Sequence, residues 1–173
     1  MDLKETVRSI VDWPVKGVIF RDLTTLMKDP QALRVACDLF YERYRDKNID
    51  TIVGIDARGF VFGAVLAYKL GVAFVPVRKK GKLPAETIEE SYSLEYGDAT
   101  MEIHVDAVSP GDKVVLIDDL LATGGTIGAA LKLIRRCGGE VLECAFVVEL
   151  PDLGGRKSVD DCGVYALMEF EGE

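Results

Sequence analysis

The sequence has a single histidine, His104, among 173 residues, and its four cysteines are never spaced as CxxC. Zinc sites draw mainly on these two residue types, and a serine-hydrolase triad needs a histidine base. A histidine-based metal site or triad is therefore poorly supported. The cysteines have apolar neighbours, which favours buried thiols in a reducing cytosol over disulfides or zinc ligands. They are Cys37, Cys137, Cys144 and Cys162.

Long apolar runs are also absent. The apolar stretches have the length of single strands, so no transmembrane span is expected. The first thirteen residues, MDLKETVRSIVDW, contain acids in an amphipathic pattern, which is typical neither of a signal peptide nor of a transit peptide. These absences predict a cytoplasmic protein that does not enter a membrane.

Positive charge is scarce, with 21 Lys and Arg against 29 Asp and Glu and a net charge of −8. This balance opposes non-specific binding to a phosphate backbone, so no nucleic-acid partner is expected. An anionic substrate would have to be attracted by a local basic cluster. The one such run is RKKGK at 78–82, which on charge alone is equally well interpreted as a solvated loop.

Strands and helices alternate along most of the chain. The pattern predicts a helix at 3–11, a loop through Phe20 and Asp22, and a helix from Asp29 to about Asp46. Further strands are predicted at 51–55, 73–77, 114–117, 141–149 and 164–170, with helices at 59–70 and 127–137. The polar segment 79–112 fits a two-stranded excursion or mobile flap. We therefore predict an α/β fold in one domain covering 1–173, with a doubly wound, mostly parallel sheet flanked by helices.

The most informative segment is VVLIDDLLATGGT at 114–126. Its apolar start is typical of a parallel strand buried on both faces. Asp118 and Asp119 follow, at the strand end where open α/β sheets bind ligands. The next residues can turn backbone N–H groups inward around an oxyanion, and the N-terminus of the following helix faces the same anion. These loop residues are Ala122, Thr123, Gly124, Gly125 and Thr126.

Other interpretations of this segment fit less well. No Lys follows the glycines, so it is not a Walker loop, and it is not a GxGxxG dinucleotide fingerprint. An ordinary strand-to-helix turn would use Gly for its backbone angles and Asp as a helix cap. Such a turn does not call for two acids, two Thr and two Gly within a few residues. The segment therefore predicts a site for a phosphorylated sugar.

A second strand end carries charge, at Asp56, Ala57 and Arg58. Arg58 could bind a pyrophosphate through two parallel N–H bonds, and helix N–H groups would add donors. An Asp cap paired with a surface Arg explains these residues equally well on their own. Two such strand ends in one sheet favour a shared site.

Segment 114–126 resembles, without a gap, the phosphoribosyl pyrophosphate (PRPP) motif of the type I phosphoribosyltransferases. Over nearly its whole length the chain resembles the adenine phosphoribosyltransferase family. That resemblance implies the type I phosphoribosyltransferase fold, with a small base-binding hood near 13–28 and a flexible flap near 79–105. The blocks that carry it are GVIFRDLT (17–24), DARGFVFG (56–63), RKKGKLP (78–84), YSLEYG (92–97) and LECAFVVEL (142–150).

The resemblance also implies roles for residues. Asp118 and Asp119 would bind the ribose hydroxyls, and the loop from Ala122 to Thr126 would hold the 5′-phosphate. A non-proline cis peptide is expected between Asp56 and Ala57. The implied pyrophosphate ligands are Ala57, Arg58, Arg78, Lys79 and Lys82, with Lys80 at a position where the family varies.

The adenine pocket is expected around Phe20, whose ring offers a stacking face, although by itself this residue is better interpreted as core packing. Backbone groups of Ile19 and Arg21 would pair with adenine N6 and N1, and Leu150 would cover the other face. A 6-oxopurine would leave a backbone carbonyl unpaired, at a cost of about 1–3 kcal/mol.

Glu95 is implied as the catalytic carboxylate near N7 or N9 of adenine, with Tyr96 acting by positioning. By itself, a Glu in a polar strand is usually solvated, so this role depends on the resemblance. The implied reaction is the reversible conversion of adenine and PRPP into AMP and pyrophosphate. Mg²⁺ is the expected cofactor, held mainly by substrate and water rather than by a protein metal site.

A homodimer is expected from the family. Two other functions remain open: the same chemistry on hypoxanthine, guanine or xanthine, and a PRPP-binding regulator without catalysis. The second is disfavoured because the chain has neither a DNA-binding segment nor a basic face.

Overall fold

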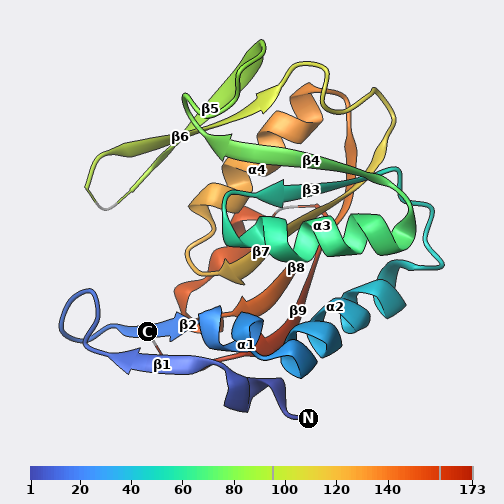
Figure 1. Cartoon of the computed structure of the whole chain (residues 1–173). Helices are drawn as coiled ribbons and strands as arrows, with labels where there is room; N and C mark the ends of the chain where they lie inside the picture. The colour runs from blue at the N-terminus through green and yellow to red at the C-terminus, as the bar shows by residue number, and fades with distance from the viewer. Residues whose placement is uncertain (95, 160, 173) are drawn as a thin grey trace.

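The computed structural model describes residues 1–94, 96–159 and 161–172. Its main sheet has the strand order β5-β6-β4-β3-β7-β8-β9 (Figure 1). Strands β4, β3, β7, β8 and β9 are parallel, and the hairpin of β5 and β6 joins β4 antiparallel. This confirms the predicted α/β fold with a mostly parallel sheet. The strands are β3 (Thr51–Ile55), β4 (Ala73–Lys79), β5 (Thr87–Ser93), β6 (Asp98–His104), β7 (Lys113–Leu121), β8 (Glu140–Glu149) and β9 (Gly163–Glu169).

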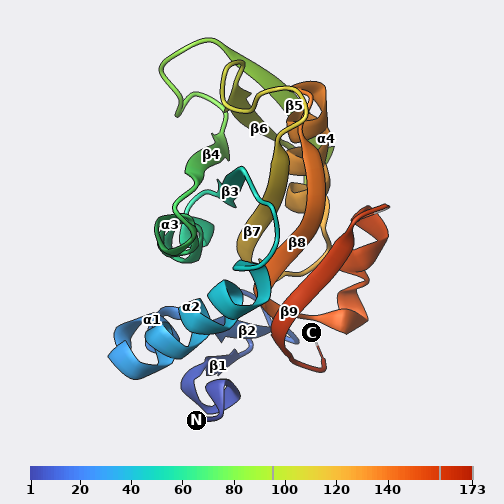
Figure 2. The ribbon, with the colours of Figure 1, turned by 90° about the vertical axis from the view of Figure 1, so that its right-hand side faces the viewer.

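Helices cover both faces of this sheet, as Figure 2 shows from the side. Side chains of successive strand residues point to opposite faces. Val115 and Ile117 therefore belong to the core beneath α2 and α3, whereas Val114 and Leu116 belong to the core beneath α4. All four are fully buried, which is why this strand is an uninterrupted apolar run in the sequence. The helices are α1 (Thr24–Lys28), α2 (Pro30–Tyr44), α3 (Arg58–Leu70) and α4 (Gly125–Arg136), with short 3-10 helices at Leu3–Thr6, Pro151–Leu153 and Gly155–Ser158.

The predicted start of α2 is confirmed. The Asp29 carboxylate accepts hydrogen bonds from the backbone N–H groups of Gln31 at 2.9 Å and Ala32 at 3.2 Å. Pro30 occupies the first turn, where its missing N–H has no helical partner to lose.

The prediction for the N-terminal segment is wrong. Instead of a helix over 3–11, a short 3-10 helix is followed by β1 (Arg8–Val11), and the predicted loop through Phe20 and Asp22 contains β2 (Ile19–Asp22). The two strands pair antiparallel as a separate small sheet, at the lower left of Figure 1. The Arg8 guanidinium donates to Asp22, with Nε at 3.0 Å. Hydrogen bonds from Thr24 and Arg8 lower the pKa of Asp22 to about 2.

These contacts explain the difference. They join residues far apart in the sequence, so they stabilise strands that the local pattern does not predict. Among the described residues, no helix combines the length and apolar composition that a membrane crossing requires.

Candidate active site

The two aspartates lie at a step in the sheet. Pairing of β7 with β3 ends at Gly54 and Ile117, whereas pairing of β7 with β8 continues to Leu121 and Glu149. Asp118 and Asp119 therefore lie beyond the last residue pair between β3 and β7. The prediction that they follow the strand is wrong in one respect, because the longer β8 keeps both of them within β7.

A cavity of about 580 Å³, which we call the edge cavity, opens at this step. It brings together both charged strand ends and the basic run, as the sequence predicts. Its lining residues are Ile55, Asp56, Ala57, Arg58, Arg78, Lys79, Lys82, Tyr92, Met101, Asp118, Asp119, Leu120 and Thr126.

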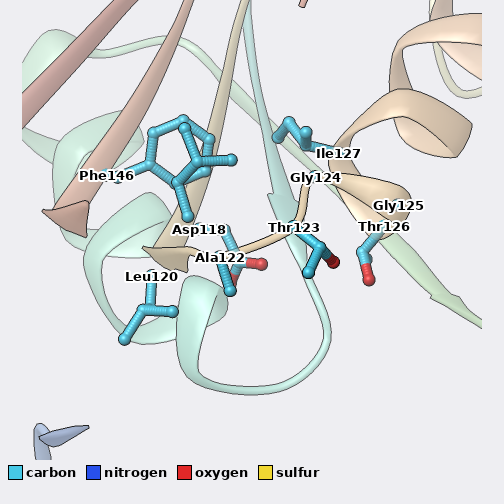
Figure 3. Close-up of a pocket in the computed structure, with 10 residues that line it drawn as sticks. Asp118, Leu120, Ala122, Thr123, Gly124, Gly125, Thr126, Ile127 and Phe146 are labelled. Atoms are coloured by element: carbon cyan, nitrogen blue, oxygen red, sulfur yellow. The ribbon is translucent and has the colours of Figure 1, made fainter. Parts of the chain in front are cut away.

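A smaller hollow of about 90 Å³, the loop cavity, adjoins it and shares Asp118, Leu120 and Thr126 with it. Figure 3 shows residues 122–126 passing from the end of β7 to the first turn of α4, with Phe146 and Ile127 above them in this view. Gly124 is the N-cap of α4, with φ of +89° and no side-chain cap. The N–H groups of this first turn are therefore available to an anion, and the helix dipole favours it. All five predicted loop residues line this cavity.

The acid pair has an asymmetric environment. Asp119 is 4% exposed and its carboxylate accepts a hydrogen bond from Arg58 Nε. The backbone N–H of Asp119 donates to Asp118 Oδ1 at 2.8 Å. Burial, followed by the charge of Asp119, raises the pKa of Asp118 well above its usual range. An ionised Asp118 is therefore stabilised by anything that brings hydrogen-bond donors or positive charge into the cavity.

The second strand end has the predicted backbone geometry: the peptide between Asp56 and Ala57 is cis. The Asp56 carboxylate accepts a hydrogen bond from Arg78 Nε at 3.1 Å. The basic run is thus joined to the end of β3. Ala57 and Arg58 begin α3 beside Asp119.

The base-binding candidates lie on other segments. Ile19, Phe20 and Arg21 are on β2, where the Phe20 and Trp13 rings meet edge to face with centroids 4.5 Å apart. Leu150 follows β8 and is 7% exposed, with its N–H bonded to the Leu121 carbonyl at 2.9 Å. None of the four lines the edge cavity or the loop cavity.

The hairpin of β5 and β6 confirms the predicted two-stranded excursion. Glu95 lies outside the described residues. Tyr96 is 88% exposed.

Sequence reasoning missed two residues here. Tyr92, on β5, lines the edge cavity, and its hydroxyl accepts a hydrogen bond from Thr126 Oγ1 at 3.0 Å. Glu102, on β6, is 4% exposed beneath the basic run. Two features of the sequence could have indicated them: Tyr92 is an aromatic residue in a polar segment, and Glu102 is a charged residue within an alternating strand.

Within the described ranges, no three His, Cys, Asp or Glu side chains converge on a common point for an ion. Asp118, Asp119 and Asp56 do supply hard oxygen donors to the edge cavity, which is the donor type that Mg²⁺ prefers.

Comparisons with known proteins agree with this geometry. Residues 22–169 match the family described as phosphoribosyl transferase domain. An adenine phosphoribosyltransferase of Desulfosudis oleivorans is 60% identical over 173 residues, which are 100% of each chain. A crystal structure of adenine phosphoribosyltransferase from Thermoanaerobacter pseudethanolicus has 48% identity and a TM-score of 0.93, covering 98% of both chains.

A third relative was solved with ligands. The adenine phosphoribosyltransferase of Trypanosoma brucei, in complex with AMP, pyrophosphate and ribose-5-phosphate, has 28% identity and a TM-score of 0.89 over 96% of this chain and 78% of that one. The family match, the full-length identity and the shared fold lead to one conclusion: this chain belongs to the phosphoribosyltransferase family, and within it to the adenine phosphoribosyltransferases, the enzymes of purine salvage.

Proposed function

We propose that the edge cavity and the loop cavity together form the site where this enzyme converts adenine and PRPP into AMP and pyrophosphate. The observation that carries the proposal is their adjacency. A cradle of backbone N–H groups at Thr126 opens into a larger cavity lined by Asp118, Asp119 and a basic run. PRPP has the same order of groups: a 5′-phosphate, then ribose hydroxyls, then a pyrophosphate.

The ribose 5-phosphate end is assigned to β7 and the loop after it. Residues 122–126 would hold the phosphate through backbone N–H groups and the Thr123 and Thr126 hydroxyls, as their positions in Figure 3 suggest. Asp118 and Asp119 would accept hydrogen bonds from the ribose hydroxyls. Their charge would also favour the oxocarbenium-like sugar that forms as the bond to pyrophosphate breaks.

The pyrophosphate end is assigned to the other wall of the edge cavity. Ala57 and Arg58, at the start of α3, line that wall together with Arg78, Lys79 and Lys82. Cations and helix N–H groups stabilise the negative charge that accumulates on the departing group. Lys80 forms an ion pair with Glu89 at 3.0 Å and does not line the cavity, so it is left out of this assignment.

Phosphoribosyltransferases generally use Mg²⁺ with PRPP, and the donors here fit that use. Mg²⁺ commonly takes one or two protein carboxylates and completes its shell with substrate phosphates and water. Asp118 and Asp119 would contact such an ion. When bound, it would offset the negative charge that accumulates on the departing pyrophosphate.

Adenine recognition is assigned to the edge of β2. This strand pairs on one side only, with β1, so the backbone N–H and C=O groups on its other side are available to a ligand. Ile19 and Arg21 would present such groups to the base. Phe20 is half-buried on the same strand and would supply a stacking face, with Leu150 at the end of β8 as the opposing apolar surface.

The test of the reaction is a purine panel. Purified protein with Mg²⁺ and PRPP is expected to release pyrophosphate rapidly with adenine and far more slowly with hypoxanthine, guanine or xanthine. A preference for a 6-oxopurine would move the assignment to another base. Binding of PRPP without turnover on any purine would indicate a regulator.

Glu95 remains a prediction from the sequence as the carboxylate that accepts the adenine ring proton. Replacing Glu95 with Gln is expected to lower kcat by about 10²–10⁴-fold while changing PRPP affinity little, because general-base catalysis contributes on that scale. Steady-state kinetics beside calorimetric titration with PRPP would measure both quantities. An unchanged kcat would remove Glu95 from this role.

We also infer a cytoplasmic homodimer. Helices α2 and α3 form an exposed apolar groove of about 490 Å³ between Leu33, Cys37, Val65 and Tyr68, and Tyr68 is 87% exposed. Its rim carries side chains of both charges, which suits a self-complementary contact about a two-fold axis. Light scattering after gel filtration is expected to give twice the mass of one chain. The mass of a single chain would contradict the dimer.

A further inference from the structure

A buried carboxylate lies beneath the basic run. Glu102 is on β6, directly opposite Arg78 of β4, and is 4% exposed. Its Oε1 accepts hydrogen bonds from the backbone N–H groups of Lys82 at 3.1 Å and Leu83 at 2.9 Å. Its Oε2 accepts a weaker bond from the Thr87 hydroxyl at 3.4 Å. One side chain thus contacts both the turn after β4 and the start of β5.

The carboxylate remains ionised in this position. Burial alone would raise its pKa, but hydrogen bonds from the backbone of Leu83, Gly81 and Lys82 bring the pKa of Glu102 below its ordinary value. Hydrogen bonds to an ionised acceptor are stronger than those to a neutral one. Glu102 therefore forms stronger hydrogen bonds with these N–H groups than a neutral side chain would.

The turn itself is shaped for this contact. Gly81 has φ of +87°, a left-handed conformation in which successive N–H groups can face one acceptor. Both backbone groups of Lys82 are bonded, because its carbonyl accepts a long hydrogen bond of 3.5 Å from Arg78 Nη1 and its N–H donates to Glu102. We call residues 79–83, from the last residue of β4 to Leu83, the basic turn.

A buried negative charge at Glu102 would weaken anion binding unless it also stabilises the conformation of the basic turn. A buried negative charge a few residues from cations that bind an anion opposes that anion by Coulomb repulsion. Many other hydrogen-bonding residues could hold two strands together without that repulsion. What the carboxylate provides is a fixed conformation for the backbone that carries Lys79 and Lys82, both of which line the edge cavity.

We propose that Glu102 is a positioning residue for pyrophosphate: it fixes the basic turn so that Lys79 and Lys82 face the departing group of PRPP. This inference rests on the function proposed above. It assigns Glu102 no contact with substrate, and it predicts an effect confined to the pyrophosphate end of the site.

Titration calorimetry with two ligands tests whether the effect of Glu102 is restricted to the pyrophosphate end of the site. Magnesium PRPP carries the pyrophosphate, whereas AMP lacks it and uses the other end of the site. In Glu102→Ala, PRPP affinity is expected to fall by about tenfold, a loss equal to one charge-assisted hydrogen-bonding interaction. AMP affinity is expected to stay within about twofold, because the two ends are separate. Glu140→Gln, which removes the same charge from an exposed side chain paired with Lys113, is the control.

Whether PRPP affinity falls or rises in Glu102→Ala distinguishes a positioning role from a purely electrostatic one. If Glu102 acted only through its negative charge, its removal would tighten PRPP binding, and that result would overturn the proposal. Equal weakening of PRPP and AMP would also overturn it, since it would show a general loss of structure. A wild-type protein that does not bind PRPP at all would instead contradict the proposed function.

A second variant covers the case in which Glu102→Ala does not fold. A Cβ at position 81 would meet no atom within 4 Å, so Gly81→Ala disturbs only the backbone conformation of the basic turn. The same selective loss of PRPP affinity is expected. Unchanged PRPP affinity in Gly81→Ala would show that the shape of the turn does not matter, which would overturn the proposal.

Discussion

Replacing Asp118 with Asn is expected to make the free protein more stable and nearly inactive. The carboxylate is half-buried beside Asp119, and both desolvation and that neighbouring charge disfavour its ionised form. Asn keeps the oxygen that accepts the Asp119 N–H but has no charge. Transfer is expected to fall by about 10²–10³-fold, because a charge that favours the cationic sugar is lost.

The stability effect has a definite pH dependence. The pKa of Asp118 is higher in the folded protein than in the unfolded chain. The folded state therefore binds the proton more tightly, and this contribution is complete below the unfolded pKa and lost as pH rises through the folded pKa. Above the unfolded pKa this residue opposes folding, because the folded protein must either take up a proton or hold a desolvated charge. The advantage of Asp118→Asn is thus expected to be large near neutrality and to vanish in acid.

Melting curves at several pH values, with and without magnesium PRPP, would measure this. PRPP is expected to raise the melting temperature of the wild type more than that of Asp118→Asn, which reverses their order. Asp46→Asn is the control, because the Asp46 side chain is 89% exposed and should affect neither quantity. A lower melting temperature for free Asp118→Asn at neutral pH, or unimpaired turnover, would contradict the prediction.

Replacing Gly124 with Ala is expected to remove phosphate binding. Gly124 has φ of +89°, and a Cβ there would lie 2.6 Å from the Gly155 carbonyl oxygen and 2.7 Å from Ser158 Oγ. The first of these is backbone, so the loop itself must move. We expect the protein to lose about 1–3 kcal/mol of stability and AMP affinity to fall by more than about tenfold, through strain and displaced N–H groups.

Gly128 provides the matched control within the same helix. A Cβ at this position would make an ordinary contact of 3.5 Å with Ser158 Cβ. Gly128→Ala should therefore gain about 0.5–1 kcal/mol from helix propensity and leave AMP affinity unchanged. Urea unfolding and AMP titration of both variants test the pair. Equal behaviour of the two would show that the close approach at Gly124 has no special role.

The sequence predicted those elements whose stabilising contacts are local or periodic. The uninterrupted apolar run before Asp118 indicated a strand covered on both faces, and the Asp29-Pro30 pair located the start of α2. The cis peptide at Asp56 was also expected, through the family resemblance of its block. Each of these features can be recognised from a few neighbouring residues.

The N-terminal strands could not be recognised in this way. β1 has mostly exposed side chains, so no alternation of apolar and polar residues distinguishes it from a short amphipathic helix. Its conformation depends on pairing with β2 and on the contact between Arg8 and Asp22 across the small sheet. The burial of Glu102 could not be predicted from the sequence either, because a charged residue in an alternating strand is normally expected on the solvent side.

By itself, the sequence determined the order of strands and helices from α2 onward and the composition of the loop at 122–126, because propensity, periodicity and loop composition act over short stretches of chain. Only the tertiary structure decided which charges meet. Arg58 reaches Asp119 across 61 positions, and Arg78 reaches Asp56 across 22, because the sheet places the ends of β3, β4 and β7 side by side. The pairing of these charges depends on how the whole sheet packs, which cannot be predicted from any single segment.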